Sequence, residues 1–146
     1  MPAALDRLTN RIKALAPDVV VMTGDVLDVP DEVIAGETPD SRPLQAWINE
    51  VVKDYGLVKD WFGGTSVAYV VVPGNHDHEG AFTRVFGDTS GARDLAGFRF
   101  FCFWDELASD SQPQRSGIRQ NLFRSAMTAV KHDCPQIHAQ PYMIDP

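Results

Sequence analysis

Two stretches of the chain share one pattern, and this pattern decides the fold. The first reads VVVMTGD at residues 19–25, and the second reads VVVPGNHDHE at residues 70–79. Each begins with an apolar run that is typical of a strand covered on both faces. Each then passes through a glycine, which allows a sharp turn, into side chains that can bind metal ions. The two stretches therefore predict two buried strands that end in turns with metal-binding capacity.

The segments around these strands predict a layered α/β fold. Apolar residues recur at helical spacing over residues 5–15 and again over 44–62, where Gly63 and Gly64 are expected to end the helix. Helix, strand, helix and strand in this order are typical of a parallel sheet with right-handed crossovers. Further elements are expected as helices at 81–86 and 118–130 and strands at 98–103 and 137–143, with surface loops at 26–40, 87–97 and 105–117.

Composition bounds the possible functions of the chain. Its 146 residues suit one domain, and 44% hydrophobic residues exclude a wholly disordered chain. The net charge of -7 gives no electrostatic footprint for duplex nucleic acid or an anionic membrane. Without a signal peptide or an apolar run of membrane length, a cytoplasmic location is the default expectation. Cys102 and Cys134, the two cysteines, are expected to be buried free thiols.

The carboxyl ends of neighbouring parallel strands meet at one edge of a sheet, where sites commonly form. Asp25 is therefore expected to face Asn75 and His76 across that edge. Carboxylate, amide and imidazole groups suit hard or borderline divalent cations, and paired cations can bind a phosphoryl group and activate water. A simpler interpretation remains for each motif: Asp25 could only shape a turn, residues 76–78 could be a solvated turn, and Asp28 could belong to a solvated acidic loop.

Taken together, the two motifs resemble those of the calcineurin-like metallophosphoesterases. The segment GDVLD at residues 24–28 matches that family's Gly-Asp-x-x-Asp block, and GNHD at residues 74–77 matches its Gly-Asn-His-Asp block. The likeness covers residues 5–86 well and the remainder loosely. It implies a partial α/β/β/α sandwich whose mixed sheet has a parallel βαβ core, formed by a single domain over residues 1–146.

The resemblance also implies site roles. Asp25 would be the metal-bridging carboxylate and Asn75 a ligand of the second metal, whereas Asp28 receives no ligand role. His76 would be the catalytic histidine near the phosphate, with Asp77 orienting it. The cofactors would be divalent Mn, Fe or Zn ions, two in a complete family member. His138 precedes Pro141 in a region where the family often supplies a further ligand, so it is a metal-ligand candidate and otherwise an ordinary strand-end histidine.

The chain also departs from the family pattern. It contains no Asp-x-His and no Gly-His-x-His, so we expect a domain truncated at both ends. Two functions follow: a metal-dependent hydrolase of small phosphate mono- or diesters, or a non-catalytic remnant or binding module that keeps the fold and at most one metal. Without a strand beside residues 19–22, an exposed apolar sheet edge would also favour self-association.

Overall fold

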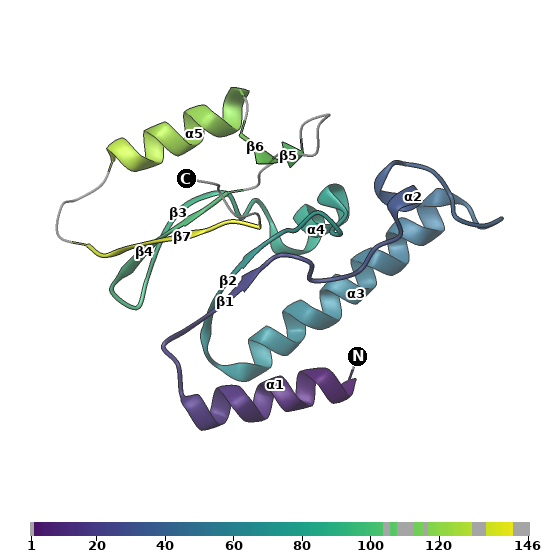
Figure 1. Ribbon diagram of the computed structural model, residues 1–146. Helices are drawn as coiled ribbons and strands as arrows, with labels where there is room; N and C mark the ends of the chain where they lie inside the picture. Colours follow the sequence, from purple (N-terminus) through teal and green to yellow (C-terminus); the bar gives the residue numbers. More distant parts are fainter. Residues whose placement is uncertain (1, 104–105, 108–112, 116, 130–133, 142–146) are drawn as a thin grey trace.

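A computed structural model describes residues 2–103, 106–107, 113–115, 117–129 and 134–141. The elements form four layers (Figure 1). Helices α1 (Pro2–Leu15) and α3 (Leu44–Thr65) cover one side of a two-stranded sheet. A second sheet lies on the other side of these strands, and α5 (Gly117–Thr128) covers its outer face. This order of layers agrees with the predicted α/β/β/α sandwich.

The first sheet pairs β1 (Val19–Thr23) with β2 (Ala68–Val72) in parallel. Helix α3 connects the two strands and thereby forms the predicted βαβ unit. The helix extends to Thr65, beyond Gly63 and Gly64, and Ser66 ends it in a left-handed conformation with φ 57°. The helical glycines have open space around them, so nothing there forces the helix to stop earlier.

The second sheet has the strand order β3-β4-β7. Strand β3 (Gly91–Leu95) pairs antiparallel with β4 (Phe98–Cys102), and β4 pairs in parallel with β7 (Gln136–Ala139). The sheet is therefore mixed, as expected. The smaller elements are α2 (Asp31–Ile34), α4 (Glu79–Phe86), β5 (Glu106–Leu107) and β6 (Pro113–Gln114).

Strand β2 contributes to both apolar cores because its side chains alternate between two covered faces. Val71 packs with α3 and α4 in one buried cluster. Val70 and Val72 pack against Phe100 and other residues of the second sheet in another cluster. The three valines are each at most 2% exposed. Strand β2 is thus fixed from both sides, and the turn that follows it begins from a rigid strand end.

Strand β1 is less covered than its apolar sequence predicts. Val21 is 38% exposed and lines an open, mostly apolar groove of about 320 Å³ beside Phe98 and Ile137. Among the described residues, β1 pairs with β2 alone, so its other edge lies along this groove. The prediction that β1 is covered on both faces was therefore wrong for Val21. Self-association through this edge stays a prediction.

Other expectations need correction. The predicted loop at 26–40 contains α2, and that at 105–117 contains β5 and β6. Residues 87–97 were expected to form a surface loop, but they contain β3, which pairs along its whole length with β4. Both cysteines are free, and Cys102 is buried as predicted, whereas Cys134 is only half-buried. Burial raises the pKa of the Cys102 thiol.

In the described part of the chain, no helix combines the length and apolar character that crossing a membrane requires.

Candidate functional site

The parallel register of β1 and β2 brings the two sequence motifs together. Thr23 pairs with Val72 at the ends of the two strands. The turns that follow, which carry Asp25 and Asn75, therefore leave the sheet at the same edge. This is the arrangement predicted from the strand-and-glycine pattern, and it follows from the parallel direction that the α3 crossover imposes.

Gly24 and Gly74 allow the two turns to touch through their backbones. A Cβ atom on Gly24 would lie 2.8 Å from the Cα atom of Gly74, and Gly24 has φ 112°. A Cβ atom on Gly74 would collide with both the carboxylate and the backbone nitrogen of Asp25. Real Cβ atoms do not approach backbone this closely, so only glycine fits at either position without a shift of the neighbouring turn.

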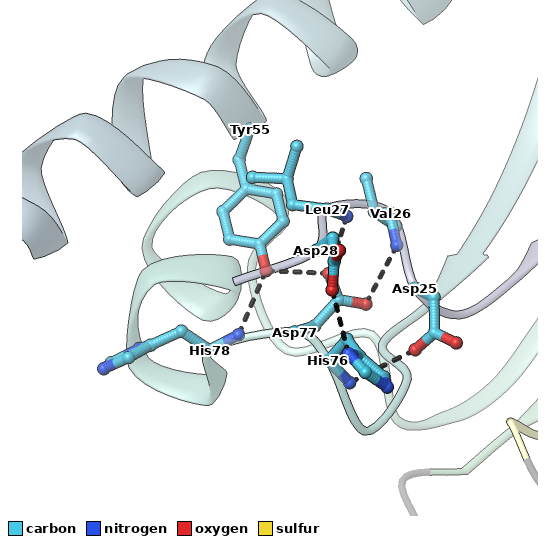
Figure 2. A network of polar contacts seen from close by, with 8 residues as sticks. All are labelled: Asp25, Val26, Leu27, Asp28, Tyr55, His76, Asp77 and His78. Carbon is cyan, nitrogen blue, oxygen red and sulfur yellow. Dashed lines mark hydrogen bonds and ion pairs between the residues drawn. The ribbon is translucent and has the colours of Figure 1, made fainter. Parts of the chain in front are cut away.

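Asp25 lies directly against the second turn (Figure 2). The backbone of Asp25 has φ 49°, a left-handed conformation that aspartate tolerates better than most residues. Its Oδ1 atom accepts a hydrogen bond of 3.2 Å from the backbone nitrogen of His76. Asp25 and Asn75 are both exposed. The carboxylate is thus positioned by the second turn and still open to solvent, where a cation could reach it.

The imidazole of His76 contacts Asp28. The Nδ1 atom of His76 lies 3.0 Å from Oδ1 of Asp28, and the side chains are 44% and 93% exposed respectively. An ionised carboxylate only accepts hydrogen bonds, so Nδ1 carries the proton in this pair. Within the described residues nothing hydrogen-bonds Nε2, and this atom remains available to a ligand. Asp28 is therefore the residue that orients the His76 ring.

Asp77 has a different position from the one that the resemblance implied. It is 3% exposed, and its carboxylate accepts hydrogen bonds from backbone nitrogens in both turns, of which Figure 2 shows those from Val26 and Leu27. Those of Val26 and Leu27 lie 3.1 Å away, and that of Gly74 lies 2.8 Å away. Asp77 therefore joins the two turns to each other, and the orientation of His76 is left to Asp28.

Tyr55 reaches this carboxylate from helix α3. Its hydroxyl donates to Oδ1 of Asp77 over 2.8 Å and accepts from the backbone nitrogen of His78 over 3.1 Å. Burial, followed by the charge of Asp77 and its hydrogen bond, raises the pKa of Tyr55 well above its usual range. The phenol therefore stays protonated and acts as a donor. His78 in turn caps the N-terminus of α4, because its Nδ1 atom accepts a hydrogen bond from the backbone nitrogen of Ala81.

His138 lies apart from this group. Its ring centroid is 5.1 Å from that of Phe101 and 6.3 Å from that of Phe123 on α5. Its neighbour Ala139 belongs instead to the core between the sheets, so the His138 ring lies on the α5 side of β7. The end of this strand does approach the first turn, since Pro141 lies 3.3 Å from the Cβ position of Gly24. The structure brings together Asp25, Asn75 and His76, and it does not add the His138 ring to them.

Two residues of the site were missed by sequence reasoning. Asp28 stands three residues after Asp25 in the Gly-Asp-x-x-Asp motif, so that spacing could have indicated a role beside His76. Tyr55 gave no such signal, because it falls on the apolar stripe of α3 and looks like an ordinary core residue. The roles of Asp25, Asn75, His76, Asp77 and His138 in metal binding or catalysis stay predictions.

The residues present fit a cation only in part. Asp25 offers a carboxylate and Asn75 an amide oxygen, both hard donors suited to a hydrated divalent ion. No cluster of three or more His, Cys, Asp or Glu side chains able to hold a metal occurs among the described residues. The donor set therefore suits one cation with water in its remaining positions.

Comparison with known proteins identifies the family of this chain. The family of calcineurin-like phosphoesterases matches residues 2–130. No curated protein matches the chain. The family match spans both strands, both turns and the connecting helix, and it agrees with the mixed α/β architecture. The chain belongs to the calcineurin-like phosphoesterase family.

Proposed function

We propose that this protein is a metal-dependent hydrolase of small phosphate mono- or diesters. In this proposal Asp25 and Asn75 bind a divalent Mn, Fe or Zn ion, and His76 acts on the phosphate. The observation that carries it is that the exposed carboxylate of Asp25 accepts a hydrogen bond of 3.2 Å from the backbone nitrogen of His76, whose side chain is 44% exposed. Family membership supports phosphoester hydrolysis as the reaction.

The chain's own residues suit proton transfer to a leaving oxygen. A bound cation would polarise the phosphoryl group and lower the pKa of a bound water. Because Nδ1 of His76 is engaged with Asp28, Nε2 would meet the ligand and would carry the transferable proton when the ring is charged. The carboxylate of Asp28 stabilises that charged ring and keeps its orientation. His76 is thus the proposed general acid and Asp28 its positioning residue.

A non-catalytic binding module is the second candidate function. The described residues offer few ligands, and the His138 ring packs on the aromatic side of its sheet, beside Phe101. One bridging carboxylate does not hold two cations without further ligands. This alternative keeps the fold and at most one weakly bound metal, and it lacks turnover.

Metal binding and turnover together separate these functions. We expect the 146-residue chain to bind Mn²⁺ weakly, as measured by calorimetry, and to hydrolyse bis-p-nitrophenyl phosphate slowly at most. Asp25→Ala should abolish both properties. Asp60→Ala is the matched control, because Asp60 is an exposed carboxylate on α3 outside the two turns. Binding without any turnover would favour the binding module, and turnover that survives in Asp25→Ala would refute the assigned site.

His76→Ala tests the role of the imidazole separately from metal binding. We expect turnover to fall by about 10²–10⁴-fold, the usual contribution of an acid–base residue. Mn²⁺ affinity should change little, because His76 is proposed to contact the phosphate. Asp28→Asn should lower turnover less and keep metal affinity. A large loss of Mn²⁺ affinity in His76→Ala would instead make this histidine a metal ligand.

A further inference from the structure

Tyr55 brings a buried hydroxyl from helix α3 to the second turn. Its side chain is fully buried, and its ring packs edge-on against those of Phe82 and Phe86, with distances of 5.6 Å and 6.0 Å between ring centroids. The ring therefore has a fixed direction, and its hydroxyl reaches the second turn from the middle of α3 (Figure 2). An aromatic side chain with two torsions loses little further entropy when it makes such a contact.

The hydroxyl completes a network that connects three segments of the chain. It donates to Asp77 and accepts from the backbone nitrogen of His78, which uses both of its hydrogen-bonding functions. Asp77 connects the hydroxyl to the first turn, because its two oxygens also accept hydrogen bonds from the backbone nitrogens of Val26 and Leu27. The position of one buried carboxylate thus sets the spacing of both turns, and Tyr55 sets the position of that carboxylate.

We propose that Tyr55 is a positioning residue that holds the Asp25 turn and the Asn75–His76 turn in one metal-binding arrangement. The consequence for metal binding rests on the function proposed above, whereas the restraint on the two turns does not. Removal of the hydroxyl leaves an acceptor site on buried Asp77 and the part-buried nitrogen of His78 without their partner. The turns then relax to recover hydrogen bonds, and Asp25 moves with them.

The restraint is tested by amide hydrogen exchange on the metal-free protein. In Tyr55→Phe we expect the amides of Val26 and Leu27 to exchange at least about 10-fold faster, while the amide of Cys102 in the second sheet changes less. Tyr69→Phe is the matched control: it also removes one phenol oxygen, and its ring stacks on Phe62 at 4.3 Å. Unchanged exchange at Val26 and Leu27, or an equal change at Cys102, would overturn the proposal.

Mn²⁺ affinity tests the consequence for the site. Partners that orient metal ligands commonly contribute 10–100-fold to affinity, so Tyr55→Phe should weaken Mn²⁺ binding by about 10-fold and Tyr69→Phe should not. Faster exchange with unchanged Mn²⁺ affinity would make Tyr55 a purely structural residue and overturn the proposed positioning role. If the wild-type chain binds no Mn²⁺, the proposed function fails, and the exchange data still decide whether Tyr55 holds the two turns.

A second variant keeps the test informative if Tyr55→Phe does not fold. Asp77→Asn retains the phenol but places an amide group against donors in both turns. It should accelerate exchange at Val26 and Leu27 in the same way. If Asp77→Asn leaves these amides protected, the carboxylate does not hold the turns, and a positioning role for Tyr55 through it is excluded.

Discussion

The two sheets of this protein are held by different interactions. Around β1 and β2, the turns are joined by Asp77, the one charged side chain that is buried among the described residues, and by Tyr55. In the second sheet, the inner face packs Phe100 with aliphatic residues and Cys102, and the face toward α5 carries contacting phenylalanine rings. Phe101 is fully buried and stacks with Phe103, which in turn contacts Phe123 on α5.

The two kinds of contact have different effects on the site and on stability. Hydrogen bonds to a buried carboxylate have fixed directions, so they set the positions of nearby backbone atoms closely. Contacts between phenylalanine rings gain free energy from burial and tolerate several geometries. Substitutions near Asp77 should therefore alter the site itself, whereas substitutions in the second sheet should lower stability and leave the site of the folded protein intact.

The largest expected loss of stability lies in the second sheet. Phe101→Ala should lower the free energy of unfolding by about 3–5 kcal/mol, since it removes a fully buried ring and leaves a cavity. Phe98→Ala on the same strand is the control and should cost far less, because Phe98 is 40% exposed. Urea denaturation measures both. If Mn²⁺ affinity of folded Phe101→Ala also falls, the two sheets are not separate in the way inferred here.

Asp77→Asn should have a smaller effect on stability and a larger one on the site. The amide nitrogen would face backbone donors of the turns, so we expect a loss of about 2–3 kcal/mol, typical for hydrogen bonds to a charged group. Mn²⁺ affinity should fall as well, in contrast to Phe101→Ala. Calorimetric titration of the folded variant and urea denaturation of a separate aliquot measure the two effects. Unchanged affinity would show that Asp77 supports the fold alone.

Gly74→Ala should cost about 1–3 kcal/mol, the usual range for overpacking, because the new methyl group collides with the backbone and carboxylate of Asp25. Gly56→Ala gives the opposite sign. It lies inside α3 with open space around it, so alanine should stabilise the helix by about 0.5–1 kcal/mol. Thermal unfolding of the two variants compares them directly. Equal shifts would mean that the turns are not in close contact.

The smallest effect concerns the segment between α4 and β3, which connects the two sheets. Hydrogen bonds from Ser90 lower the pKa of Asp88. Because the folded pKa lies below the unfolded value, the ionised group stabilises the fold above about pH 4, and this contribution is lost as pH falls through the folded pKa. The stability difference between wild type and Asp88→Asn should therefore shrink below pH 4. A difference that stays constant from pH 7 to pH 3 would exclude this contribution.

The sequence predicted the parts of the fold that depend on local pattern. Apolar runs and helical stripes indicated β1, α3 and β2, and the glycine turns indicated where Asp25 and His76 would meet. Strand β3 was missed because its residues, GARDL, alternate weakly and contain a glycine and charges. It forms by pairing with the aromatic strand β4 across Ala96 and Gly97, which have φ 50° and 81°. Such a turn is usually marked by Asn-Gly, and Ala-Gly is a weaker signal.

The site was predictable only as far as side-chain chemistry and spacing reach. Hydrogen-bond partners across the fold, such as Tyr55 with Asp77, depend on where α3 crosses the strands, and helical periodicity does not contain that information. The position of the His138 ring, beside Phe101, could not be predicted for a related reason. A strand shifted by one residue turns each side chain to the opposite face, and sequence alone did not fix the register of β7 against β4.

The contact between Gly24 and Gly74 also has a consequence for how the protein can vary. A Cβ atom at either position meets backbone atoms of the other turn, and backbone atoms cannot be exchanged for smaller ones. No second substitution can therefore make room for a side chain there, in contrast to a crowded core position, where a smaller neighbour restores the fit. The pair is therefore a point where only glycine fits, whereas the glycines inside α3, at positions 56, 63 and 64, have open space around them and leave room for a side chain.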